Sequence, residues 1–162
     1  MFQSVFTDEL GVPFEQSLDA LQSWGLEYVD LRGGIYGKPV HDLSGDELER
    51  VRSALETRGL RVGALESSLA KVHLPGKERR SEEAGKLEGL IRAANALDCR
   101  LVRSFFYWQP PEQDHGQLAV RPDQKQLALD AFRPLAERAS EAELVLAFEN
   151  CGVTAHEVLA FL

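Results

Sequence analysis

The sequence predicts an α/β protein of the (β/α) barrel type, with parallel strands inside and helices outside. Three observations predict this class. An apolar strand pattern, entered through a helix end and a bend, recurs at 24–32, 58–67, 98–105 and 143–150. Helical patterns fill the intervals between these segments. The turns that enter the strands are short, whereas the loops that leave them are long, as expected where binding loops gather at one end of a barrel.

An opening strand at Phe2–Phe6 brings the expected total to five. A closed barrel of this type has eight βα units. We therefore expect residues 1–162 to form a single, partial barrel domain, truncated before the barrel closes.

The helices are predicted from apolar residues that repeat on one face and from end signals. Ser44 and Glu47 have the spacing of a capping box, which opens a helix that ends at Gly59. Thr154 opens a fifth helix with the same signal. The other expected helices are Pro13–Trp24, Glu78–Leu97 and Pro122–Ser140. The last of these is expected to bury Leu127, Ala131, Leu135 and Ala139.

Composition narrows the classes of partner. The 26 acidic residues outnumber the 18 basic ones, for a net charge of −8, which disfavours binding to a phosphate backbone. The sequence shows no signal-peptide pattern and no apolar run long enough to cross a membrane. Two cysteines are too few for a disulfide framework. We expect a cytoplasmic protein that binds neither nucleic acid nor membrane.

The candidate site lies where the strands end, because barrels of this type build their chemistry at the C-terminal mouth. In 144–150 large and small residues alternate, which directs Glu149 into the barrel. Arg103 could bind an oxygen of a substrate or form an interior ion pair with Asp30 or Glu66. The aromatic run 105–108 could stack on a sugar or cover the mouth of the barrel. The further candidates for substrate contact are Asp30, Arg32, Glu66, His73, Asn150 and Trp108.

These segments resemble the xylose isomerase-like superfamily of barrels, which includes sugar isomerases, epimerases and endonuclease IV. The resemblance rests on Tyr28–Arg32 with Gly33–Gly34, on Leu101–Arg103, and on Leu146–Asn150. It implies a divalent cation (Mn²⁺, Mg²⁺ or Zn²⁺) held by carboxylates and an imidazole at the ends of strands five to eight. Glu149 is then the first metal ligand and a proton shuttle.

The leading interpretation is the N-terminal part of a metal-dependent sugar, or sugar phosphate, isomerase or epimerase that transfers a proton alpha to a carbonyl. This chain alone is expected to be inactive, because the other ligands belong to strands it lacks. One alternative is a phosphodiesterase similar to endonuclease IV, although 66–68 and 103–105 contain none of the histidines that such enzymes use. Another is a non-catalytic half-barrel that works by association, as a homodimer or with a chain that supplies the missing C-terminal half.

Overall fold

The computed structural model describes residues 3–72, 77–107, 122–149, 155 and 158–159. Four parallel strands form one open sheet in the order β1-β2-β3-β4. The strands are β1 (Tyr28–Leu31), β2 (Arg61–Leu69), β3 (Leu101–Ser104) and β4 (Val145–Phe148). Because neighbours in the chain are neighbours in the sheet, the topology is that of consecutive βα units, and it confirms the predicted fold class.

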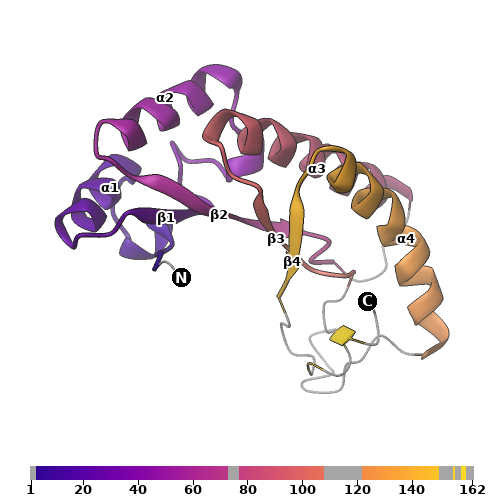
Figure 1. Ribbon diagram of the computed structural model, residues 1–162. Helices are drawn as coiled ribbons and strands as arrows, with labels where there is room; N and C mark the ends of the chain where they lie inside the picture. Colours follow the sequence, from indigo (N-terminus) through magenta and orange to yellow (C-terminus); the bar gives the residue numbers. More distant parts are fainter. Residues whose placement is uncertain (1–2, 73–76, 108–121, 150–154, 156–157, 160–162) are drawn as a thin grey trace.

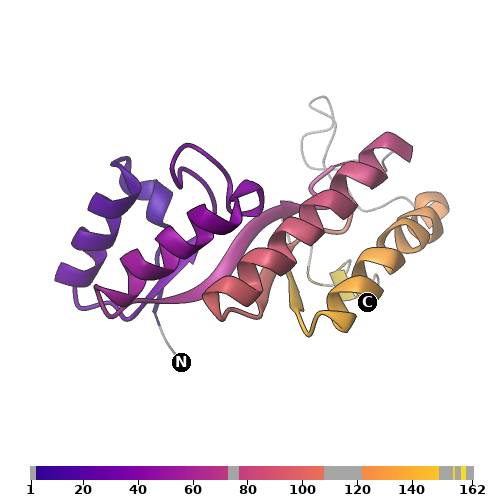
Figure 2. The ribbon, with the colours of Figure 1, turned by 90° about the horizontal axis from the view of Figure 1, so that it is seen from above.

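Helices cover one face of the curved sheet (Figures 1 and 2). The α-helices are α1 (Phe14–Ser23), α2 (Gly45–Glu56), α3 (Lys77–Leu97) and α4 (Pro122–Glu141). Two short 3₁₀ helices, η1 (Thr7–Leu10) and η2 (Val40–Asp42), lie in the connections before α1 and α2. The open sheet with helices on its outside is the arrangement of a partial barrel.

The helix signals read from the sequence are largely confirmed. Ser44 accepts a hydrogen bond from the Glu47 N–H, and the Glu47 carboxylate accepts one from the Ser44 N–H, which completes the capping box of α2. Gly25 (φ 77°) and Gly59 (φ 65°) have the left-handed backbone that ends α1 and α2. Because each helix ends at such a glycine, the turn that leads into the following strand is short.

Two predictions about these elements were wrong. The strand expected at 2–6 is reduced, in the described residues, to an isolated parallel bridge between Phe6 and Asp30. The Asp30 N–H donates to the Val5 carbonyl oxygen at 2.9 Å, so this segment lies beside β1 without forming a ladder. Leu127 is 58% exposed rather than buried. The buried face of α4 contains Ala128, Ala131, Phe132, Leu135 and Ala139.

Three of the four predicted residues, Ala131, Leu135 and Ala139, are buried as expected, so the apolar stripe of α4 differs from the prediction only at its edge. Leu127 falls outside that stripe, whereas Phe132, which the pattern had not included, fills the inward position. The expected helix from Thr154 lies almost entirely outside the described residues.

The core lies between the sheet and the helices, with α3 in the centre. Leu31, Leu65 and Leu90 are completely buried there. At Gly89, α3 approaches η2 so closely that a β-carbon would collide with the backbone carbonyl oxygen of His41. Within the described residues, no helix combines the length and the apolar character needed to cross a membrane.

Candidate functional site

Three of the predicted site residues meet at the C-terminal ends of neighbouring strands. Arg103 on β3 donates from Nη1 to Glu149 Oε2, which follows β4, at 2.8 Å. Its Nε lies 3.1 Å from Glu66 Oε2 on β2. The Arg103 and Glu66 side chains are only 15% and 14% exposed, whereas Glu149 is 37% exposed. The cluster is thus a mostly buried arginine between two carboxylates, one of which solvent can reach.

An irregularity in β2 shapes this cluster. Leu65 pairs with Val102 and Leu69 pairs with Ser104, so four steps along β2 match two steps along β3. A bulge of this kind redirects side chains from strict alternation. Here it brings the carbonyl oxygens of Glu66 and Ser67 to the Arg103 guanidinium, which donates to them at 3.3 and 3.1 Å. The guanidinium is therefore held by backbone as well as by carboxylates.

The surroundings of Glu66 raise the pKa of its carboxyl. Burial raises the pKa of the Glu66 carboxyl above its ordinary value of 4.5, and the positive charge of Arg103 offsets part of that rise. The negative charges of Asp30 and Glu149 raise the pKa further. Glu66 thus holds its proton to a higher pH than an exposed glutamate does.

The other described candidates lie to one side of this cluster. Asp30 on β1 accepts a hydrogen bond from the Ser4 hydroxyl at 2.6 Å and acts on Glu66 through its charge. Arg32 donates from Nε to Asp8 at 2.8 Å and from Nη2 to Glu9 at 3.3 Å. The interior ion pair expected for Arg103 is therefore formed with Glu66. For Asp30, no ion pair with Arg103 is found in the described residues.

Three candidates, His73, Trp108 and Asn150, lie outside the described residues. Of the aromatic run, Phe105, Phe106 and Tyr107 are buried in the protein interior. Their burial favours a structural role over sugar stacking. Phe105 also flanks the site, since its ring centre lies 5.4 Å from the Arg103 guanidinium carbon.

Sequence reasoning missed two contributors to the site. Ser67 is buried, and its hydroxyl donates to the Arg103 carbonyl oxygen at 2.6 Å. Phe6, which was expected to be an ordinary strand residue, places its ring 5.9 Å from the Arg103 guanidinium. The serine carries no chemical signature by itself. Only its place directly after Glu66 at the end of a strand could have drawn attention to it.

A divalent cation of the expected kind does not find a complete site in these residues. In the part of the chain that the structure describes, no three His, Cys, Asp or Glu side chains are grouped to hold a metal ion. The nearest approach is the cluster itself, which has only two carboxylates, both of them paired with Arg103. The described residues can therefore supply single ligands but not a metal centre.

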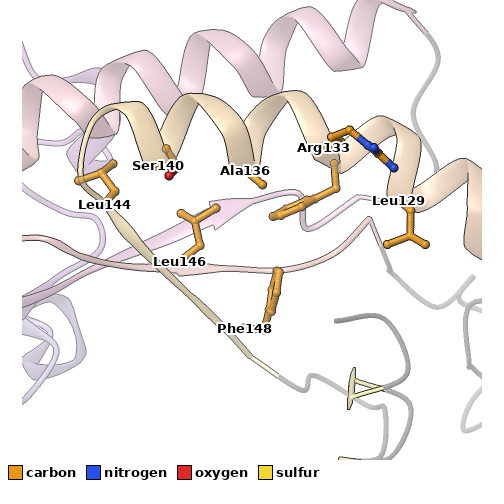
Figure 3. A pocket seen from close by; sticks show the side chains of 9 residues that line it. Leu129, Arg133, Ala136, Ser140, Leu144, Leu146 and Phe148 are labelled. Carbon is orange, nitrogen blue, oxygen red and sulfur yellow. The ribbon is translucent and has the colours of Figure 1, made fainter.

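A separate apolar groove runs between α4 and β4 (Figure 3). It has a volume of about 370 Å³ and is lined on the strand side by Leu144, Leu146 and Phe148. Leu129 and Ala136 of α4 form much of the opposite wall. The large residues of β4 thus face the helix, as the alternation predicted. The groove lies beside the last described strand, so no further described strand or helix closes it.

Solved structures support the fold. The chain has a TM-score of 0.74 and 18% identity to the probable 3-DHS dehydratase AsbF of Bacillus anthracis, covering 100% of this chain and 58% of that one. D-psicose 3-epimerase of Clostridium cellulolyticum H10, with D-tagatose, has a TM-score of 0.74 at 11% identity, covering 99% and 58%. A xylose isomerase-like TIM barrel protein of Mycobacterium smegmatis, in complex with magnesium, has a TM-score of 0.67 at 18% identity, covering 91% and 51%.

At these identities the likeness shows the fold alone, and the chain spans little more than half the length of these structures. No match is found among curated proteins. The model of the xylose isomerase-like TIM barrel family, however, matches residues 18–162, which is most of the chain. The chain therefore belongs to the xylose isomerase-like TIM barrel family.

Proposed function

We propose that the described residues form part of the active site of a sugar isomerase or epimerase, which transfers a proton alpha to a carbonyl. The observation that carries the proposal is the Glu66–Arg103–Glu149 cluster at the C-terminal edge of the sheet. It combines an accessible carboxylate, a fixed cation and a second carboxyl whose pKa is raised by burial. The epimerase among the similar structures supports the reaction class.

Each member of the cluster has a defined part in this chemistry. Glu149 is the most exposed of the three and acts as the base that removes the proton from carbon. The electron pair of the broken C–H bond moves onto the carbonyl oxygen and forms an enediolate. Arg103 stabilises the developing negative charge with its guanidinium. Delivery of a proton to the opposite face of the same carbon inverts it, whereas delivery to the neighbouring carbon, with a proton moved between the two oxygens, gives the isomer.

Glu66 supports this step as a proton donor. Its pKa is raised, so it retains a proton to a higher pH than an exposed glutamate does. A carboxylic acid close to the enediolate can donate that proton to oxygen. Active sites often raise the pKa of one of two neighbouring carboxyls, so that this one acts as the acid and the other, ionised one acts as the base.

The complete site is proposed to include a divalent cation, either Mg²⁺, Mn²⁺ or Zn²⁺, with Glu149 as one ligand. A hard cation would take up charge on the enediolate oxygens. The magnesium complex among the similar structures supports this proposal. The other ligands must come from outside the described residues, because these contain no group of three suitable side chains. A carboxylate has two oxygens, so Glu149 can keep one on Arg103.

We also propose that the apolar groove and the open edge of β4 are covered by the next βα unit of the barrel, whichever polypeptide carries it. This chain covers 58% of each of two similar structures, and the remainder of each is enough for the other βα units of a barrel. The lining of the groove by Leu146, Phe148 and Leu129 suits an apolar neighbour. Without that neighbour, the 162-residue chain is expected to associate with a second copy and to lack turnover.

Hydrogen exchange with solvent tests the proposed reaction class. The protein purified from its natural source is incubated in D₂O with Mn²⁺ or Mg²⁺ and a panel of aldoses, ketoses and sugar phosphates. Proton NMR follows the loss of signal from the hydrogen on the carbon next to the carbonyl, as deuterium replaces it. We expect exchange with at least one sugar. Absence of exchange with every sugar, together with cleavage of DNA that contains an abasic site, would replace the proposal by a phosphodiesterase.

A further inference from the structure

The bulge in β2 has a buried polar side chain at its centre. Two residues more are used between Leu65 and Leu69 than between their partners on β3. Bulges leave backbone groups without ladder partners, and such groups must find others when they are buried. Ser67 is 2% exposed and sits in the middle of this segment.

The Ser67 hydroxyl uses both its donor and its acceptor capacity inside the bulge. It donates to the Arg103 carbonyl oxygen at 2.6 Å and accepts from the Leu69 N–H at 3.0 Å. It therefore ties β2 to β3 at the point where regular pairing between the two strands is interrupted. A side chain with only a donor or only an acceptor could not make both bonds.

The same segment holds the other end of Arg103. The Ser67 carbonyl oxygen accepts from Arg103 Nε at 3.1 Å, and the Glu66 carbonyl oxygen accepts from Nη2 at 3.3 Å. These oxygens reach the guanidinium because the bulge turns them towards it. Nη1 then remains directed at Glu149. Ser67 thus contacts Arg103 twice. Its hydroxyl binds the Arg103 carbonyl oxygen, and its own carbonyl oxygen binds the Arg103 guanidinium.

We infer that Ser67 is a positioning residue, which locks the β2 bulge so that the Arg103 guanidinium stays fixed between Glu66 and Glu149. The inference deepens the proposed function and rests on it for any effect on turnover. The role of Ser67 in holding Arg103 does not depend on the proposed function, because the bonds that hold the guanidinium are all made within the described residues. Removal of the hydroxyl leaves the Arg103 carbonyl and the Leu69 N–H without this partner, and the bulge loosens.

The first test measures the guanidinium directly in the 162-residue chain. NMR follows solvent exchange of the Arg103 Hε proton in the wild type, in Ser67→Ala and in Ser68→Ala. Ser68 is the matched control, since it lies in the same bulge but its residue is exposed. We expect exchange to be roughly 10-fold faster or more in Ser67→Ala and unchanged in Ser68→Ala, because the opening of the bulge releases Nε. Equal exchange in all three proteins would overturn the inference.

A wild-type measurement covers the case in which Ser67→Ala does not fold. Arg61 on the same strand is exposed, and its Hε proton serves as an internal reference. If Arg103 Hε exchanges as fast as Arg61 Hε in the wild type, the guanidinium is not held and the inference fails. Slow exchange at Arg103 supports the fixed guanidinium on which the inference rests, without any variant.

Turnover then separates the inference from the proposed function. In the natural protein, Ser67→Ala is expected to lower kcat for hydrogen exchange roughly 10- to 100-fold, through misplacement of Arg103, with a smaller change in KM. Unchanged kcat beside faster Hε exchange would show that the positioning has no catalytic role. Absence of exchange activity in the wild type would contradict the proposed function alone and would leave the Hε result to decide the role of Ser67.

Discussion

Arg103 Nη1 and Glu149 Oε2 lie 2.8 Å apart, although 46 residues separate the two in the sequence. The pair forms because β3 and β4 are parallel neighbours in register, with Arg103 opposite Ala147. Glu149 is therefore one step beyond the end of β4, beside the guanidinium. Parallel topology thus brings two strand ends that are distant in the sequence into one local site.

The pH dependence of stability should report the raised pKa of Glu66. A carboxyl whose pKa is higher in the folded state than its ordinary 4.5 favours folding below pH 4.5, and this contribution is lost as the pH rises through the folded-state pKa. Replacement of Glu66 by Gln removes the titration. The free energy of unfolding of the wild type should therefore fall relative to that of Glu66→Gln as the pH increases from 4.5.

Urea denaturation at several pH values measures this difference. Glu137→Gln, an exposed position on α4, is the control and should follow the wild type at every pH. A wild type that instead gains stability relative to Glu66→Gln as the pH rises towards 4.5, and keeps that gain at higher pH, would show that the pKa of Glu66 is depressed and that Arg103 outweighs burial.

Two glycines of α3 should respond in opposite directions to the same substitution. A β-carbon at Gly89 would collide with the carbonyl oxygen of His41, whereas one at Gly85 meets open space. Gly89→Ala is expected to cost about 1–3 kcal/mol of unfolding free energy through overpacking against η2. Gly85→Ala should stabilise the chain by about 0.5–1 kcal/mol, because alanine is the better helix former. Thermal and urea unfolding measure the stability of the two variants. Equal stabilisation of both would contradict the close approach of α3 and η2.

Association of the 162-residue chain should depend on the apolar groove. Phe148 lines the groove, and Leu127 lies on α4 outside its lining, so the two positions form a matched pair. Phe148→Glu is expected to lower the mass found by light scattering, since a charge would then be buried in the contact. Leu127→Glu should leave the mass unchanged. A wild type that remains a monomer at high concentration would refute the self-association proposed for this surface.

The sequence was sufficient to predict the class of fold and most helix boundaries. These features follow from local signals such as the Ser44–Glu47 box and the turns at Gly25 and Gly59. The strand at 2–6 was overestimated, because an apolar run does not reveal whether the segment pairs with its neighbour along its length or only at a single bridge. Leu127 was misplaced, because two overlapping stripes on α4 differ by a single residue and only packing decides between them.

The candidate site was predicted in composition but not in arrangement. Strand-end position and alternation were enough to select Glu66, Arg103 and Glu149. The bulge in β2 was not predictable, since it depends on pairing between β2 and β3 and leaves no local pattern. Ser67 was missed for that reason. Arg32 was also a candidate for substrate contact, but it pairs with Asp8 of η1.

The most direct test of the account is the effect of Glu149→Gln on solvent exchange in the natural protein, with the sugar that the wild type accepts. Glu149 is proposed to be the base, so the rate at saturating sugar should fall by about 10²–10⁴-fold. Glu137→Gln should retain the wild-type rate. The charge of Glu149 is removed but its size is kept, so the fold should persist. Exchange at the wild-type rate in Glu149→Gln would contradict the central claim that this carboxylate moves the proton.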